Sequence, residues 1–163
     1  MMEAAPAIFS AIEASAFGAA IRQSRWLYMV ANVGHIVSLM VFAGAIAVMD
    51  MRMAGALSAT SPGYVLKMAR RVAMAGFAGL VLSGVFLFSA EASHVIMNRV
   101  FQVKLGLIAL GLLNIALFEI LIAPKVKDLP PLVPLPPGAR TGAVTSLAIW
   151  IAVAICGRSI AYF

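Results

Sequence analysis

A few polar side chains stand out because the rest of this chain is strongly apolar. His35 lies near the middle of a long apolar stretch, and Asn32 precedes it by about one helical turn on the same face. An ionisable group deep in a bilayer usually marks a functional site with a partner nearby. An imidazole at that depth can ligate the iron of a b-type haem. His35 is therefore our candidate metal ligand, and Asn32 the neighbour that orients it.

A purely structural interpretation of His35 stays open at this point. Its imidazole could instead hydrogen-bond across helices to a polar side chain such as Ser83 or Asn114. The residues alone do not separate these two interpretations.

The haem hypothesis also requires cations that would face the haem propionates. Lys104 begins the third apolar stretch and Arg158 lies near the end of the fourth, so an antiparallel bundle places both in the same half as His35. A guanidinium pairs well with carboxylates, although both residues could simply be snorkelling anchors. We predict Lys104 and Arg158 as propionate partners. His94, the other histidine, is a cofactor-binding candidate only if its connector dips inward, and a surface position is favoured.

The composition indicates a membrane protein. Hydrophobic residues make up 63% of the chain and charged residues 11%, whereas soluble domains are about half apolar and about a quarter charged. The net charge of +6 comes from bases that flank the apolar stretches, so anionic lipid headgroups rather than nucleic acid are the expected partner. The single cysteine excludes an intrachain disulfide and a c-type haem motif.

Four stretches are long enough to cross a hydrocarbon core, which takes roughly 20 helical residues. They cover about residues 26–49, 72–90, 103–123 and 141–162. Residues 6–23 are too mixed to span and predict an amphipathic helix on the membrane surface. Residues 128–140 contain five prolines and predict an extended loop. The short connectors predict one all-α domain, an integral membrane four-helix antiparallel bundle.

Charges near the ends of the stretches give a weak orientation signal. More lysines and arginines fall in the first and third connections than on the other face. This bias predicts a bacterial inner-membrane protein with both termini on the periplasmic side. At the inner boundary, we expect Arg52 to be neutralised by Asp50 or Glu119.

The chain resembles a family of small uncharacterised bacterial inner-membrane proteins, from about Arg22 onward. The resemblance rests on His35, Gly44, the run Asp50-Met51-Arg52-Met53-Ala54-Gly55, Gly84, Leu87-Phe88, Asn98, Phe101, Lys104, Trp150 and the ending Gly157-Arg158-Ser159-Ile160-Ala161-Tyr162. It is more distantly similar to HemJ-type protoporphyrinogen oxidases and to the copper-resistance CopD membrane domain.

The distant resemblance carries a functional implication. HemJ-type proteins have a functional histidine in the first span and a lysine at the start of the third, which correspond here to His35 and Lys104. The resemblance implies haem or porphyrin chemistry, and the CopD likeness implies copper handling. The Asp-x-Arg-x-x-Gly ending of the first span and Arg158 depart from the HemJ pattern, so we do not extend the resemblance to porphyrinogen oxidation.

These patterns predict a membrane protein that binds haem b through His35 and transfers electrons. The donor would be a quinone or membrane protein, and the acceptor a partner at the outer face; a homo-oligomer is also compatible. The alternative is a structural subunit or assembly factor without a cofactor. A third hypothesis is copper or small-solute transport along Asn114 and Glu119. No arrangement of residues suggests hydrolysis, and whether the protein is an enzyme stays open.

Overall fold

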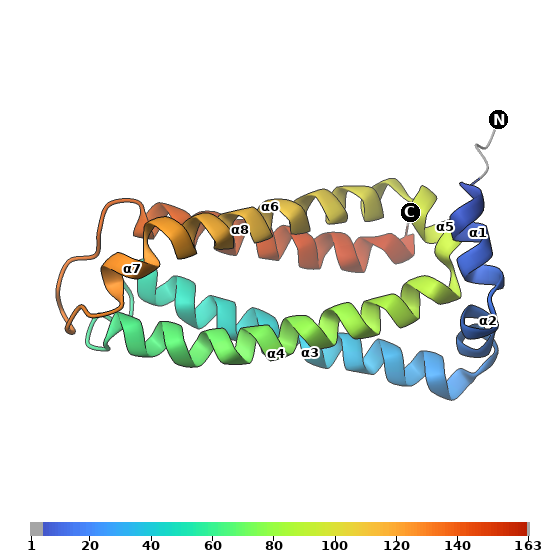
Figure 1. The fold of residues 1–163 in the computed structure, drawn as a ribbon, viewed down its shortest axis with the longest axis horizontal. Helices are drawn as coiled ribbons and strands as arrows, with labels where there is room; N and C mark the ends of the chain where they lie inside the picture. Colours follow the sequence, from blue (N-terminus) through green and yellow to red (C-terminus); the bar gives the residue numbers. More distant parts are fainter. Residues whose placement is uncertain (1–4, 163) are drawn as a thin grey trace.

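The computed structural model describes residues 5–162, and within them it contains helices and no strand (Figure 1). Four long helices form the body: α3 (Arg25–Met53), α4 (Pro62–Ala90), α6 (Arg99–Leu121) and α8 (Ala139–Ser159). Successive long helices run antiparallel (Figure 1). Each is long and apolar enough to cross a membrane. The predicted all-α four-helix bundle is therefore confirmed.

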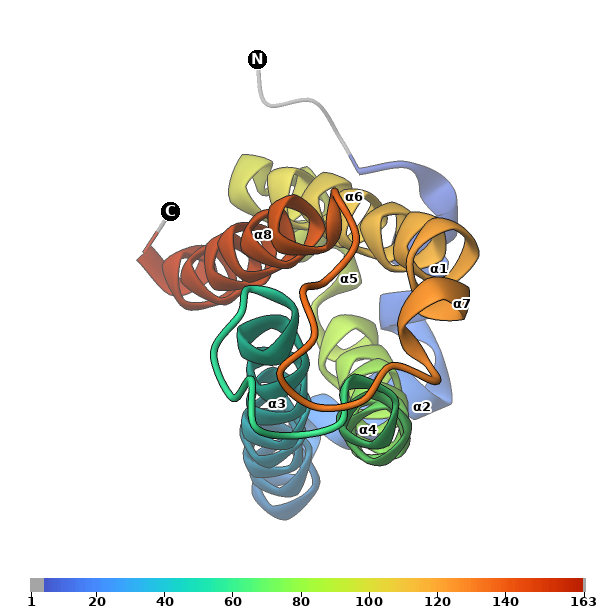
Figure 2. The same ribbon diagram turned by 90° about the vertical axis from the view of Figure 1, so that its left-hand side faces the viewer.

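The bundle is built from two helix pairs. Packing is closest between α3 and α4 and between α6 and α8, while α8 also contacts α3. Viewed along its length, the bundle has α6 and α8 on one side and α3 and α4 on the other (Figure 2). Contact between α4 and α6 is slight. The two pairs therefore meet mainly along the line between α3 and α8.

Local sequence signals explain where the long helices begin. Ser24 caps α3, because its side chain accepts a hydrogen bond from the Leu27 N–H at 3.3 Å. Pro62 occupies the first turn of α4, where its missing N–H is harmless. Asn98 caps α6 by accepting from Val100 N–H at 2.8 Å. The helices therefore start ahead of the apolar stretches that mark the predicted spans.

The predicted single helix over residues 6–23 is wrong in detail, because the structure has two short helices there. These are α1 (Ala7–Ala14) and α2 (Ala16–Gln23), and they lie across the end of the bundle that also holds the C-terminus (Figure 1). Ser15 has an extended backbone, and its side chain caps α2 by accepting from Gly18 N–H at 3.1 Å. A good N-capping residue thus divides the segment. We call this end of the bundle the terminal end.

The connectors contain more structure than the sequence suggested. A short helix α5 (Ala92–Met97) fills the connector after α4, and a 3-10 turn η1 (Ile160–Tyr162) follows α8. Pro124 lies at the start of a further short helix, α7 (Ala123–Val126), instead of only stopping the third span. The proline-rich loop is irregular, as predicted, and its Leu132 N–H donates to the Ser58 carbonyl at 2.9 Å. We call this opposite end the loop end.

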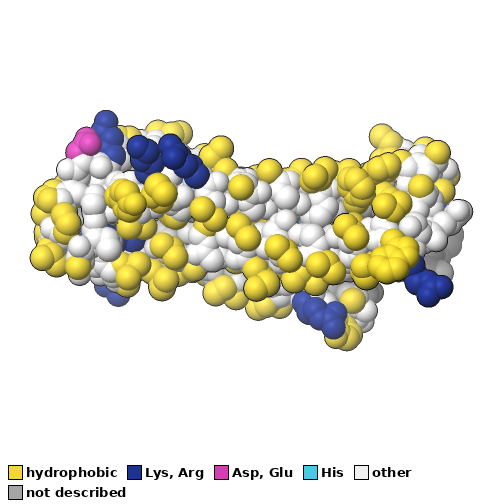
Figure 3. Space-filling model, turned by 90° about the horizontal axis from the view of Figure 1, so that it is seen from below, with side chains coloured by type: hydrophobic (Ala, Val, Ile, Leu, Met, Phe, Trp, Pro, Cys, Tyr) yellow, Lys and Arg dark blue, Asp and Glu magenta, His cyan; other side chains and the backbone are white. Residues whose placement is uncertain are grey.

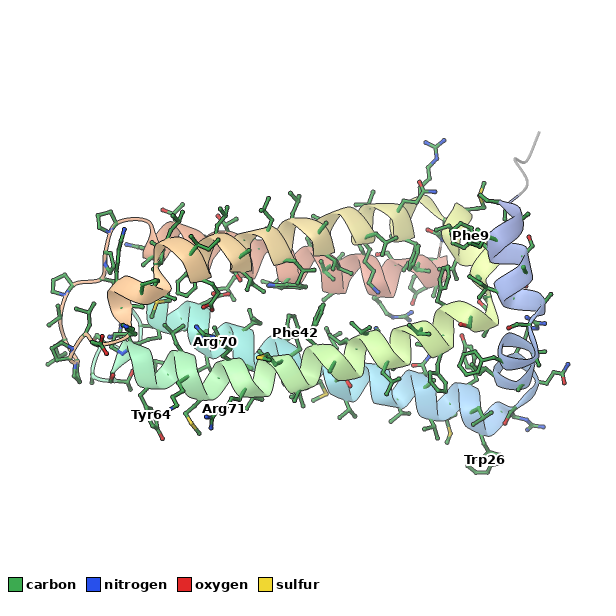
Figure 4. The ribbon with its side chains drawn as sticks, in the orientation of Figure 1. Phe9, Trp26, Phe42, Tyr64, Arg70 and Arg71 are labelled. Carbon is green, nitrogen blue, oxygen red and sulfur yellow. The ribbon has the colours of Figure 1, made fainter. Side chains whose placement is uncertain are left out.

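The outer surface matches the expected environment of a multi-pass membrane protein. Trp26 and Tyr64 project outward near opposite ends of the bundle (Figure 4) and are 75% and 67% exposed. Aromatic residues at both ends are typical of the two membrane interfaces. Hydrophobic side chains cover much of the face between the ends, and many of the basic side chains on it gather near the loop end (Figure 3).

Candidate functional site

An aromatic layer near the middle of the bundle joins the two helix pairs. Phe42 on α3 is buried and its ring lies 4.7 Å from that of Trp150 on α8, in an edge-to-face contact. Phe42 also projects between the pairs in Figure 4. Trp150 packs against Gly111 on α6, where a Cβ would lie 2.8 Å from the indole ring. Phe42 and Trp150 belong to one buried core cluster on the loop-end side of His35. His35 lies about two helical turns nearer the terminal end than Phe42.

His35 is held by Ser83 on the neighbouring helix α4. Its Nδ1 lies 2.9 Å from Ser83 Oγ, and that hydroxyl lies 2.6 Å from the Gly79 carbonyl. A carbonyl only accepts, so the hydroxyl donates its proton to Gly79 and accepts from Nδ1–H of His35. The network therefore assigns the imidazole proton to Nδ1. The lone pair is left on Nε2.

No described residue hydrogen-bonds Nε2 of His35, and this available nitrogen is the chemically important feature of the ring. Histidines that bind metals usually donate their other ring N–H to a hydrogen-bond acceptor, which fixes the tautomer and the ring orientation. Ser83 supplies that acceptor here. His35 is therefore prepared to bind a Lewis acid or to accept a proton through Nε2.

Lys104 approaches the same region from α6. Its ammonium lies within Coulombic reach of the His35 ring and of the Cys156 thiol. A Cβ added to Gly157 would lie 3.5 Å from Lys104 Nζ, and one added to Gly84 would lie 3.6 Å from His35 Cε1. The two glycines thus leave space beside both side chains. All four long helices contribute to this polar group, which we call the His35–Lys104 site.

Three other predicted residues lie apart from this site. Asn32 is exposed, and the hydrogen-bond partner of His35 is Ser83 instead. His94 is exposed on α5. Arg158 is also exposed; its guanidinium hydrogen-bonds the Tyr162 hydroxyl and lies 4.6 Å from the centre of that ring. The structure therefore places His35 and Lys104 within electrostatic range of each other, whereas the remaining candidates are exposed on the outside of the bundle.

The predicted neutralisation of Arg52 by Glu119 is wrong. Glu119 pairs with Arg70 on α4, with 2.7 Å between Arg70 Nη2 and Glu119 Oε1. Figure 4 shows Arg70 pointing toward the other helix pair and Arg71 pointing away. Arg52 instead is buried and donates from Nε to the Thr60 carbonyl at 3.1 Å. The physical reason is the rotation of α4 about its axis, which turns Arg70 toward Glu119 on α6.

The residues of the His35–Lys104 site fit a haem in some respects. They offer one imidazole with a free Nε2 and one cation for a propionate. Among the described residues, no group of three or more His, Cys, Asp or Glu side chains could hold a metal ion on its own. The two cavities at the loop end are lined by neither His35 nor Lys104.

The smaller of these cavities lies beside Asn114 and Glu119, the residues of the transport hypothesis. Its volume is about 30 Å³, and Asp50 and Ser146 also line it. This volume suits about one water molecule. Asn114 uses its amide to donate to the Gly142 carbonyl at 3.2 Å, which indicates a helix-joining role.

Comparison with known sequences places the chain in a family. The profile of a family of unknown function, DUF6644, matches residues 8–163. The chain belongs to this family. No curated protein and no solved structure matches it significantly. Membership in DUF6644 agrees with the predicted resemblance to an uncharacterised family, while no comparison links the chain to HemJ-type proteins or to CopD.

Proposed function

We propose that this protein is a b-type haem protein of the bacterial inner membrane, with both termini on the periplasmic side. It would pass electrons between a quinone or protein donor in the membrane and a partner at the outer face. The observation that carries the proposal is the hydrogen-bond network that leaves Nε2 of His35 free. The general rarity of ionisable groups inside bilayers adds weight to it.

Each residue of the site has a distinct role in this proposal. His35 would hold the iron through Nε2, and Ser83 fixes the orientation of the imidazole by accepting from Nδ1–H. Lys104 provides positive charge for a propionate. The bound haem would supply one-electron oxidation and reduction. The aromatic layer of Phe42 and Trp150 separates the site from the loop end.

A second candidate function rests on the same hydrogen bond. The contact between His35 and Ser83 joins α3 to α4, and interhelical hydrogen bonds of this kind stabilise membrane bundles. In that case the protein is a structural subunit or assembly factor without a cofactor. His35→Gln would then preserve its behaviour, and the protein would copurify with a larger complex.

An absorption spectrum separates the two candidates. Protein purified from haem-replete cells should show a Soret band, and His35→Ala should abolish it. His94→Ala is the matched control, because it removes the exposed histidine and should leave the band unchanged. Ser83→Ala should weaken haem retention by about 10–100-fold, since it removes the group that orients the ligand. A colourless wild-type protein, or a band that survives His35→Ala, would overturn the haem proposal.

A further inference from the structure

A second polar pocket lies at the loop end, far from His35. Its volume is about 430 Å³, it is open on one side, and it is lined by the end of α3, the connector that follows, the proline-rich loop and the start of α8. Arg52 lines it and lies 17 residues beyond His35 on α3, or about 25 Å along the axis. The hydrogen bond from Leu132 N–H to the Ser58 carbonyl ties the two loops together over the pocket. We call this cavity the Arg52 pocket.

Arg52 presents an unused charged group to this pocket. Its side chain is 1% exposed, and its Nη2 is buried without a hydrogen-bond partner among the described residues. A buried charge without a counter-charge is strongly unfavourable. Only Nε is engaged, by the Thr60 carbonyl. The guanidinium is therefore incomplete without an acceptor from outside the described chain.

The nearby carboxylates do not supply that acceptor. Asp50 lies two residues earlier on α3, which turns it about 200° away around the axis, and it lines the smaller cavity with Ser146. Glu119 pairs with Arg70, and Asp128 lies 3.8 Å from Lys127. Among the described residues, neither Arg52 nor Arg140 forms an ion pair within 4 Å.

The first turn of α8 adds positive potential on the opposite wall. Its N-cap is Gly138, which has a positive φ of 88° and no side chain with which to cap the helix. Ala139 N–H donates to the Pro136 carbonyl, but the N–H groups of Arg140 and Thr141 have no acceptor among the described residues. Free N–H groups at a helix N-terminus favour anions. The Arg140 side chain lies at the same pocket and is exposed.

We propose that the Arg52 pocket binds a phosphate group, with its oxygens accepting from the Arg140 guanidinium, from the free N–H groups of α8 and from the Arg52 guanidinium at the pocket wall. Trp26, at the terminal interface, and Arg52 are about 39 Å apart along α3. That separation places Arg52 at the headgroup level of the opposite leaflet. The natural source is therefore the headgroup of an anionic phospholipid, although a free phosphate shares the same chemistry. The Arg52 pocket goes beyond the haem proposal and does not depend on it.

The test compares two lipids that carry the same phosphodiester but differ in net charge, because the choline cation of phosphatidylcholine offsets its phosphate. The intact protein is placed in nanodiscs of phosphatidylcholine with increasing phosphatidylglycerol, and bound lipid is counted by native mass spectrometry after transfer to detergent. We expect one retained phosphatidylglycerol per chain and a higher melting temperature than in phosphatidylcholine alone. A parallel titration with inorganic phosphate in neutral detergent shows whether a soluble anion also occupies the pocket.

Two variants locate the binding, and a third controls for charge. Arg140→Gln changes an exposed side chain and should weaken phosphatidylglycerol retention about tenfold or more, since charged hydrogen bonds are lost. Arg52→Gln should do the same where it folds. Arg71→Gln removes an exposed charge near the loop end but outside the pocket, and should change nothing.

The possible outcomes separate cleanly. Selective retention of phosphatidylglycerol that Arg140→Gln removes supports a lipid site, and saturation by inorganic phosphate that Arg140→Gln removes supports a soluble phosphate ligand. Equal retention of both lipids with no phosphate effect overturns the proposal, as does a loss that Arg71→Gln reproduces. The Soret band tests the haem proposal separately. The Arg52 and Arg140 variants should not change it, and its absence from the wild-type protein would leave the phosphate proposal intact.

Discussion

The close approach of α3 and α4 at Gly76 gives the most quantitative prediction. A Cβ added to Gly76 would lie 2.7 Å from the Phe42 backbone nitrogen and 3.0 Å from its Cα. The first distance is about 0.7 Å shorter than an ordinary contact of 3.4 Å. Backbone atoms cannot move aside as a flexible side chain can, so Gly76→Ala must push the two helices apart.

The expected size of the effect follows from two opposing contributions. Overpacking of this kind costs about 1–3 kcal/mol, while replacing glycine by alanine in a helix regains about 0.4–1 kcal/mol of conformational entropy. The net loss of about 1–2 kcal/mol should lower the melting temperature by about 2–8 °C for a chain of this size. Melting is followed by circular dichroism in a fixed detergent.

Gly44→Ala is the matched control on α3. Nothing lies within 4 Å of the position that its Cβ would take, so the variant should melt at the wild-type temperature or slightly above it. Equal melting of Gly76→Ala and Gly44→Ala would refute the close packing of α3 on α4 at Phe42. A loss confined to Gly76→Ala would support it.

Two further predictions concern charged contacts at opposite ends of the bundle. The Ser93 N–H donates to Glu13 Oε2 at 2.8 Å and holds the pKa of Glu13 below its ordinary 4.5. The stabilisation from this contact is therefore complete above pH 4.5 and is lost as the pH falls through the lowered pKa of Glu13. Glu13→Gln should lower the melting temperature at pH 7 and have no effect in strong acid. A difference in melting temperature that persists in acid would contradict this. The side chains of Arg70 and Glu119 are 40% and 37% exposed. A double-mutant cycle should therefore give a coupling free energy below about 1 kcal/mol. A coupling free energy of several kcal/mol would show instead that the pair is shielded from solvent.

The bundle could be predicted because lipid leaves few alternatives. Every backbone polar group must be satisfied inside the hydrocarbon region, so long apolar stretches must be helices. The N-terminal segment was harder, since Ser15 could continue a helix or cap a new one, and its local hydrogen bond to Gly18 decided the outcome. Pro124 posed the same problem, because proline both ends one helix and opens another.

The site was predictable only in depth along each helix. Distance from the membrane edge predicts His35 and Lys104 in the same half of the bundle, and the structure places the Lys104 charge within electrostatic range of the His35 ring. Rotation about the helix axis decides which side chains meet, and a pattern that is apolar on all faces does not reveal it. This explains why Asn32 lies on the exposed surface and why Ser83, one of two possible partners, is the one that His35 contacts.

The two-pair organisation also bears on how the chain is assembled during synthesis. Because α3 packs most closely on the next long helix, α4, these two helices can pair as soon as both have been synthesised, before α6 and α8 follow. The second hairpin then docks when Trp150 reaches Phe42, more than a hundred residues earlier in the chain. Assembly therefore needs one late step that joins residues far apart in the sequence. In that step the α3–α4 pair docks on the α6–α8 pair, and each pair has already formed from helices that follow each other in the chain.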